Sequence, residues 1–303
     1  MPARSDVVAD VEVPAPPFWG SRIVKGVAVA DYTSLLDERA LFLGQWGLRG
    51  VRGGPGPQKG PTYEELVETE GRPRLRYWLD RLSTDGILAH AAVVYGYFPA
   101  VSEGDDVVVL TEPTGLSGRS TSFAPYNAPE RFRFTFPRQQ RGRFLCIADF
   151  IRSRELATER GQVDVLPFQL VTMGQPIADF ANELFASDSY RDYLEVHGIG
   201  VQLTEALAEY WHKRVREELK FPDHVMAAED PDSVEDYFKL GYRGARFSFG
   251  YGACPNLEDR AKMVELLQPD RIGVTLSEEL QLHPEQSTDA FVLHHPEAKY
   301  FNV

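Results

Sequence analysis

The sequence predicts a single α+β domain in which helices flank a twisted, mainly antiparallel sheet. Hairpin-like strands mix with pairs of helices, instead of alternating with them one by one as in a doubly wound parallel sheet. A Rossmann domain is excluded, because no G-x-G-x-x-G motif follows a predicted strand. With 303 residues, 43% of them hydrophobic, the chain is long enough to bury a substantial core.

The charge balance argues against nucleic acid or a membrane surface as a partner. The 45 acidic residues outnumber the 32 lysines and arginines, which gives a formal net charge of -13 and long-range repulsion of phosphate groups. Two cysteines, Cys146 and Cys254, cannot form a disulfide framework. No apolar run approaches the roughly 20 residues that span a bilayer, and no signal peptide is recognisable. We expect a cytoplasmic protein.

The N-terminal segment alternates proline with small and acidic residues. Residues 1–18 therefore predict a linker that precedes one domain over residues 19–303. Residues 21–32 predict a strand, and a helix is expected from about Leu35. Asp37 lies in the first turn of that helix, where a negative charge is favoured whether or not it has another role.

Two helices and a hairpin are predicted next. The loop at residues 51–61 contains Lys59 without the flanking residues of a phosphate-binding loop, so nucleoside triphosphate binding is rejected. Residues 63–86 have the spacing of amphipathic helices interrupted at residues 71–73. Residues 87–111 predict two strands joined by a turn at residues 103–106.

Two further strands are expected at residues 131–138 and 144–151. The first alternates arginine with phenylalanine, a pattern that also suits single-stranded RNA. One such patch in an acidic protein favours a half-buried strand instead. Residues 163–174 then predict a buried strand.

Two helices, at residues 177–200 and 201–221, follow that strand. In the second, a core stripe recurs every four residues: Leu203, Leu207, Trp211, Val215 and Leu219. Glu205, Glu209, His212 and Arg216 are left near a predicted solvated face. Glu209 and His212 have the E-x-x-H spacing of a di-iron helix, but no second copy exists, so no metal is predicted.

The most distinctive stretch is YRGARFSFGYGACP, residues 242–255. Arg246, several aromatics and three glycines predict a curved loop that suits an anionic, partly aromatic ligand. A purely structural cluster is the alternative, with Arg246 in a salt bridge. Nucleophilic catalysis has little support, because no G-x-S-x-G elbow is present and neither cysteine lies near a histidine in sequence. A helix from Asn256 and two terminal strands complete the chain.

This stretch resembles the Y-x-G-x-R-x-x-x-G-Y-x-x-C-P signature of the C-terminal activation domain of cobalamin-dependent methionine synthase. VVYGYFPAVSEGDDVVVL, FLCIADFI, LTEALAEYWHKRVREEL and HPEAKYFNV resemble family segments in the same order, so the resemblance covers about Pro16 to Val303. It implies a module of a methyltransferase of methionine biosynthesis that binds S-adenosylmethionine. Such a domain supplies a methyl group to inactive cob(II)alamin on the cobalamin-binding domain, while a flavodoxin-type protein supplies an electron.

The resemblance also implies roles for single residues. Arg246 would hold the methionine carboxylate, and Ser248 would offer backbone groups. Asp37 would pair with the α-ammonium group, and Glu205 would lie near the ligand and the cobalamin. We expect the isolated domain to bind S-adenosylmethionine without turnover.

Three aromatic residues receive implied roles as well. Tyr300 and Phe301 would flank the adenosine, and Tyr251, the one catalytic residue, would approach the corrin. Phe301 departs from the family's second tyrosine, and Val201 stands where relatives commonly have an aspartate. A docking module without ligand binding, or a free-standing reactivating protein that acts in trans, are the alternative functions.

Overall fold

The computed structural model describes residues 3–51, 60–112 and 128–303. The strands are β1 (Gly20–Lys25), β2 (Ala92–Glu103), β3 (Asp106–Leu110), β4 (Glu130–Thr135), β5 (Asp164–Thr172), β6 (Ala245–Phe247), β7 (Thr275–Leu276), β8 (Leu282–His283) and β9 (Ser287–Leu293). The helices are α1 (Tyr63–Leu66), α2 (Arg72–Thr84), α3 (Arg154–Arg160), α4 (Gln175–Ala186), α5 (Tyr190–Glu218), α6 (Val234–Phe238) and α7 (Asp259–Leu267).

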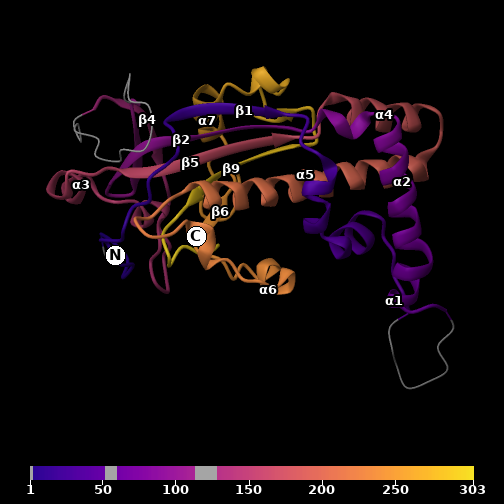
Figure 1. Cartoon of the computed structure of the whole chain (residues 1–303), viewed down its shortest axis with the longest axis horizontal. Helices are drawn as coiled ribbons and strands as arrows, with labels where there is room; N and C mark the ends of the chain where they lie inside the picture. The colour runs from indigo at the N-terminus through magenta and orange to yellow at the C-terminus, as the bar shows by residue number, and fades with distance from the viewer. Residues whose placement is uncertain (1–2, 52–59, 113–127) are drawn as a thin grey trace.

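The centre of the molecule is an antiparallel sheet in the order β4-β3-β2-β5-β9-β6, with β1 paired to the first part of β2 (Figure 1). The long strands β2 and β5 pair from Ala92 opposite Thr172 to Ala100 opposite Asp164. The predicted hairpin is confirmed by β2 and β3, and the strand predicted at residues 131–138 is β4. The predicted α+β class with an antiparallel sheet is therefore confirmed.

Both faces of the sheet are covered, because successive side chains of a strand point to opposite sides. From β2, Phe98 packs against Phe168, which in turn packs against Phe291, in the core beneath α7. Tyr95 and Tyr97 face the other way, into the core that α5 covers. Figure 1 shows α5 and α7 on opposite sides of the strands. The face under α5 carries the candidate site.

The boundary predicted near residue 200 between two helices is wrong. α4 ends at Ala186, and α5 runs without a break through Gly198 and Gly200. These glycines allow close packing: a Cβ on Gly198 would lie 2.8 Å from the Cβ of Gln45, and one on Gly200 would lie 2.9 Å from the Cγ of Gln286. These two positions need a residue without a side chain, and the close tertiary packing offsets the low helix propensity of glycine.

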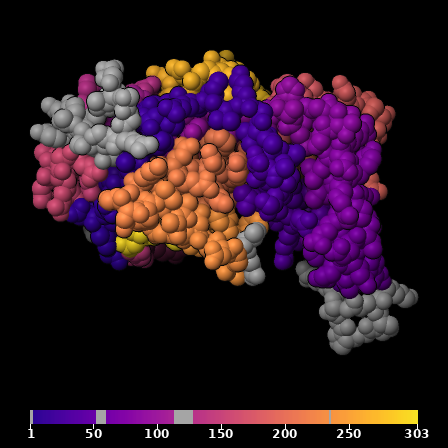
Figure 2. All heavy atoms as spheres, viewed as in Figure 1, coloured from indigo at the N-terminus to yellow at the C-terminus, as the bar shows by residue number. Residues whose placement is uncertain are grey.

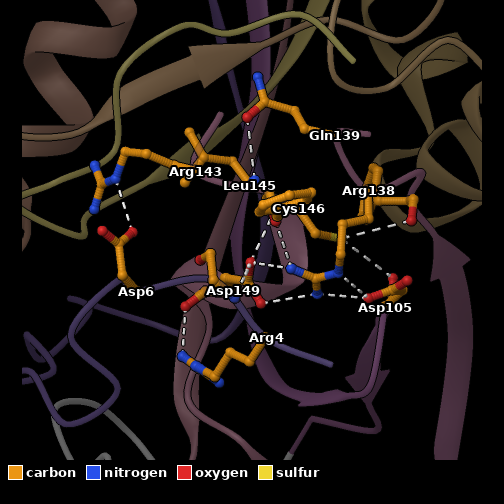
Figure 3. A network of polar contacts seen from close by, with 12 residues as sticks. Arg4, Asp6, Asp105, Arg138, Gln139, Arg143, Leu145, Cys146 and Asp149 are labelled. Atoms are coloured by element: carbon orange, nitrogen blue, oxygen red, sulfur yellow. Dashed lines mark hydrogen bonds and ion pairs between the residues drawn. The ribbon is translucent and has the colours of Figure 1, made fainter. Parts of the chain in front are cut away.

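The strand predicted at residues 144–151 is also wrong. Ile147–Phe150 form a 3-10 turn around the buried carboxylate of Asp149 (Figure 3). That carboxylate accepts hydrogen bonds from the Cys146 amide (3.1 Å) and from both terminal nitrogens of Arg138 (2.6 and 2.9 Å). An acid inside an apolar run must find such partners when it is buried, and the turn supplies them.

The N-terminal quarter contains two further departures. The helix expected from Leu35 begins only after Asp37, whose carboxylate accepts a hydrogen bond from the Ala40 amide (2.9 Å). The interruption predicted at residues 71–73 is absent, since a π-helical segment, Val67–Gly71, leads directly into α2. Most of the glycine-rich loop, with Lys59, lies outside the described residues.

Residues 3–18 lie along the folded body in an extended conformation. Val7, Val13 and Phe18 are buried, and Ala15 pairs with Lys220. Figure 2 shows the indigo N-terminal part of the chain against the orange segment that contains residue 220. The assignment of residues 1–18 as a linker remains a prediction. Across the described ranges, no helix is long and apolar enough to cross a membrane.

Candidate functional site

Arg246 projects from the short edge strand β6 toward α5. β6 pairs with β9, and Arg246 lies opposite Val292. Its neighbours in the strand, Ala245 and Phe247, belong to the core on the far face, where Phe247 stacks on Phe291 (centroids 5.7 Å apart). Strand alternation therefore directs the Arg246 side chain to the α5 face.

Two carboxylates on α5 meet this guanidinium. Glu209 Oε2 lies 2.7 Å from Nη1 of Arg246, and Glu205 Oε2 lies 3.5 Å from Nη2. Burial alone would lower the pKa of Arg246, but Glu209 and Glu205 outweigh it and raise that pKa. Arg246 is therefore a permanent cation at the wall of a cavity.

The loop after β6 turns on glycines in the left-handed region, Gly250 (φ 93°) and Gly252 (φ 50°). A Cβ on Gly252 would lie 2.5 Å from the Tyr300 hydroxyl, so only glycine allows the loop to approach the C-terminal segment this closely. Tyr251, between the two glycines, is 64% exposed. The loop thus presents a tyrosine to the outside of the cavity.

Ser248 and Cys254 hold this loop in place. The Ser248 hydroxyl donates to the Asp289 carbonyl (2.6 Å), and the Cys254 thiol donates to the Ser248 carbonyl (2.9 Å). Burial raises the pKa of Cys254 to about 12, so its thiol is neutral at physiological pH. Cys254 is a structural residue and not a nucleophile.

The two aromatic residues near the C-terminus lie in different surroundings, Tyr300 at a cavity and Phe301 in the core. Tyr300 is 50% exposed and stacks on Phe247 (centroids 5.9 Å apart). Phe301 is buried, and its ring packs against Phe247 (5.8 Å) and Phe150 (6.0 Å). Phe301 therefore lies behind the site and does not line its cavities.

Three adjacent cavities share Glu205 as a wall. The central cavity, about 350 Å³, is lined by Glu205, Glu209, Leu240, Tyr242, Gly244, Ala245, Arg246, Ser248, Tyr251, Thr288, Lys299 and Tyr300. On one side the Asp37 cavity, about 370 Å³, also reaches Arg246. On the other side the Gln286 cavity, about 570 Å³, also reaches Tyr251. Each volume falls in the range of small-molecule sites, and two cations, Arg246 and Lys299, and three tyrosines line the central one.

The structure brings together most of the residues that the sequence singled out. Arg246, Ser248, Tyr251, Tyr300 and Glu205 line the central cavity, and Asp37 lines the neighbouring one. The carboxylate of Asp37 also caps its own helical segment, so the helix-terminus interpretation and the cavity position hold together. Val201 lines the Gln286 cavity.

The predicted solvated face of α5 holds for Glu205 but is wrong for the other three residues. His212 and Arg216 are fully buried, and the Glu209 side chain is only 13% exposed. Burial, and after it the nearby Arg216 cation, lowers the pKa of His212 to about 3, so the ring is neutral. A four-residue period identifies one buried face of a helix. α5 is packed against several elements at once, so side chains on its other faces are buried as well. Among the described residues no group of His, Cys, Asp and Glu could hold a metal ion.

Glu209 is the site residue that the sequence interpretation missed. It follows Glu205 by four residues in LTEALAE, so both carboxylates lie on the same helix face. That spacing was a usable signal, because a cation that approaches Glu205 must also come near Glu209.

Comparisons with known proteins agree with this arrangement. A family model described as the activation domain of vitamin B12 dependent methionine synthase matches residues 75–303. The methionine synthase of Mycobacterium tuberculosis (strain ATCC 25618 / H37Rv) is 83% identical over 304 residues, which cover 100% of this chain and 24% of that protein. The methionine synthase of Mycobacterium leprae (strain TN) is 79% identical over the same length. The chain thus spans about a quarter of the length of these relatives.

A solved structure shares the fold. The crystal structure of the MetH reactivation domain bound to AdoHcy superposes with a TM-score of 0.74 at 24% sequence identity. The similarity covers 96% of this chain and 83% of that one. At this identity the likeness supports the architecture of the chain and not the details of its site.

Proposed function

We propose that this chain, which belongs to the activation domain family of vitamin B12 dependent methionine synthase, binds S-adenosylmethionine in its central cavity and presents the methyl group to cobalamin on another domain of the same enzyme. The 24% share of the relatives' length leaves room for such a domain elsewhere in the polypeptide. The AdoHcy named for the similar solved domain is the demethylated form of this ligand, which favours the same ligand class here.

The observation that carries the proposal is that the Arg246 guanidinium has few hydrogen-bond acceptors inside the protein. Nη1 of Arg246 lies near Glu209 without hydrogen-bond geometry, and Nη2 makes one long contact with Glu205. A ligand carboxylate in the cavity would supply the paired acceptors that a guanidinium favours. Among the described residues, this arginine is the one that joins a buried unpartnered nitrogen to a cavity wall lined with tyrosines.

The other residues fit the remaining groups of the ligand. The ring of Tyr300 offers a stacking surface for the adenine, and Glu205 and Asp37 offer negative charge to the ammonium and the sulfonium. Ser248 lines the same wall, where its backbone groups would meet the ligand. Phe301 supports Tyr300 from the core through Phe247, which replaces the direct ligand contact expected from the sequence.

The chain contributes positioning to the methyl transfer. When bound, cobalamin supplies the cobalt that accepts the methyl group as the sulfur–methyl bond breaks and the sulfonium becomes a neutral thioether. Exposed Tyr251, at the junction of the central and Gln286 cavities, would face the corrin. Holding the methyl group at the surface in one orientation is the main catalytic gain available to such a site.

The proposal includes two partners and a compartment. A cobalamin-binding domain of the same enzyme would dock over Tyr251, and a flavodoxin-type protein would supply the electron that reductive methylation requires. The two cysteines are both free and buried, which suits a reducing cytoplasm.

Calorimetry with S-adenosylmethionine tests the proposal. Wild-type chain is expected to bind, and Arg246→Met is expected to weaken binding about 30-fold, about 2 kcal/mol, because a charge-assisted pair is lost. Arg214→Met is the matched control, since Arg214 is an exposed arginine of α5 that pairs with Glu217. A folded wild type that releases no heat, or an Arg246→Met variant with unchanged affinity, would sink the proposal and favour a docking module without a ligand.

A further inference from the structure

Two glutamates one helical turn apart share the Arg246 guanidinium, and we propose that they have different tasks. Glu209 is the fixed partner that positions Arg246 for the carboxylate of the ligand. Glu205 is a displaceable partner that occupies the guanidinium until the ligand arrives. This inference rests on the proposed function. It concerns how Arg246 is positioned for the carboxylate of the ligand.

Glu209 is held between Arg246 and a buried wall. Its Oε2 lies 2.7 Å from Nη1 of Arg246, and its Oε1 lies 3.8 Å from Nδ1 of His212. Behind it, Tyr242 packs edge-on against His212 (5.1 Å, 88°), and the Arg216 guanidinium lies 4.0 Å from the centre of the Tyr242 ring. These groups close the side of Glu209 that lies away from the two cavities it lines, and its exposed fraction stays low.

The charge state of this group matches a fixed role. Burial alone would raise the pKa of the Glu209 carboxyl, but the Arg246 guanidinium outweighs it and holds that pKa well below its usual range. Glu209 is therefore ionised at any pH at which the protein works. Removing one member of a buried ion pair is costly, so the ligand is not expected to break this contact.

Glu205 is more exposed than Glu209 and lies farther from the Arg246 guanidinium. Its side chain is 52% exposed, and its Oε2 is 3.5 Å from Nη2 of Arg246. Exposed ion pairs of this kind contribute about 1 kcal/mol or less. Glu205 also borders all three cavities, so it can leave Arg246 and still face a cationic ligand.

The exchange of partners follows from this contrast. An incoming carboxylate takes the Nη2 edge of Arg246, and the displaced Glu205 then faces the ammonium and sulfonium charges of the same ligand. Glu209 stays beside Nη1 throughout as its charge partner, which keeps the guanidinium in place and leaves the hydrogen atoms of Nη1 available to the ligand carboxylate. The glutamates should therefore have opposite effects on how strongly the site recognises a carboxylate.

The test compares S-adenosylmethionine with its decarboxylated analogue, which keeps the adenosine, the sulfonium and the amine. The ratio of the two dissociation constants measures carboxylate recognition, and it is expected to be about 30 in the wild type. Glu209→Gln should reduce the ratio to about 3 or less, and Glu209→Asp should restore part of it. Glu205→Gln should keep the ratio or raise it, because a competitor for Arg246 has been removed.

Binding of the decarboxylated analogue also reports whether each variant is folded. A ratio that rises in Glu209→Gln would show that Glu209 competes for Arg246 and would overturn the inference. Equal losses of the ratio in Glu209→Gln and Glu205→Gln would overturn it too. Failure of the wild type to bind S-adenosylmethionine would instead refute the proposed function, so the two failures are distinguishable.

Discussion

Two arginines in this molecule each meet two acidic side chains, yet they differ in how completely their donors are used. Arg138 holds Asp149 with both terminal nitrogens and Asp105 with Nε (3.0 Å) and Nη2 (2.6 Å) (Figure 3). It also donates to the Phe144 carbonyl (2.8 Å), and its side chain is only 4% exposed. Arg246 has one long hydrogen bond, to Glu205, and its side chain lines the central cavity.

The difference separates a structural cation from one that is ready for a ligand. Every donor of Arg138 has an acceptor inside the protein, so a ligand has nothing to offer it. Arg246 has carboxylates nearby for its charge but few acceptors in good geometry for its donors. Charge balance without hydrogen-bond saturation is therefore the feature that marks the binding site.

The largest expected effect comes from removing the saturated arginine. Arg138→Met should lower the free energy of unfolding by about 3 to 5 kcal/mol, because Asp149 would remain as a buried charge without its partner. Arg246→Met should lower it less, by about 2 kcal/mol, because Glu209 loses its mostly buried partner but lines a cavity that water can enter. Urea unfolding of the two variants beside the wild type measures both values. Similar losses in the two variants would break the comparison.

The sequence predicted the framework of the fold well where local pattern and tertiary role agree. The hairpin of β2 and β3 follows from two apolar runs around an acidic turn, and it is present. The run at residues 144–151 has the same apolar character but folds as a turn, because Asp149 requires Arg138, which lies outside the run, 11 residues earlier in the chain. A local pattern cannot report that partner.

The candidate site was predictable to the extent that its residues lie in one motif. Arg246, Ser248 and Tyr251 come from a single loop, and the structure places them around one cavity. Phe301 was grouped with Tyr300 because the resemblance implies a pair of aromatics there, but adjacent residues of an extended chain face opposite ways. Glu209 was missed because its helix face was expected to be solvated, and only the packing around α5 shows that it is not.

Tyr300 and Phe301 differ in the same way as the two arginines, since one lines a cavity and the other is packed in the core. Phe301→Ala should lower the free energy of unfolding by about 3 kcal/mol, because it opens a cavity against Phe150 and Phe247. Tyr300→Ala should cost about 1 kcal/mol or less in stability but weaken S-adenosylmethionine binding about fivefold through lost stacking. Thermal unfolding and calorimetry on both variants separate the two effects. An equal loss of affinity in a stably folded Phe301→Ala chain would place Phe301 at the ligand after all.

The two regions also differ in how the charge of a buried group changes their stability in acid. Near Arg138, burial alone would raise the pKa of Asp149, but Arg138 holds it below its usual value, so this carboxylate contributes stability that is lost only in strong acid. Near Arg246, the pKa of His212 is about 3, far below its value of 6.5 in an unfolded chain. Between these two pH values the unfolded state binds a proton at His212 that the folded state does not.

Stability should therefore fall as the pH drops below about 6.5, with His212 contributing a slope of about 1.4 kcal/mol per pH unit. His212→Leu should remove this contribution, and because neither ring nitrogen has a hydrogen-bond partner, the variant should stay folded. Urea unfolding of the wild type and the variant from pH 4.5 to 8 gives the two slopes. Above pH 7 the slopes should coincide, which serves as the internal control. Equal slopes below pH 6 would mean that His212 becomes charged in the folded protein and that the wall behind Glu209 is less closed than its contacts indicate.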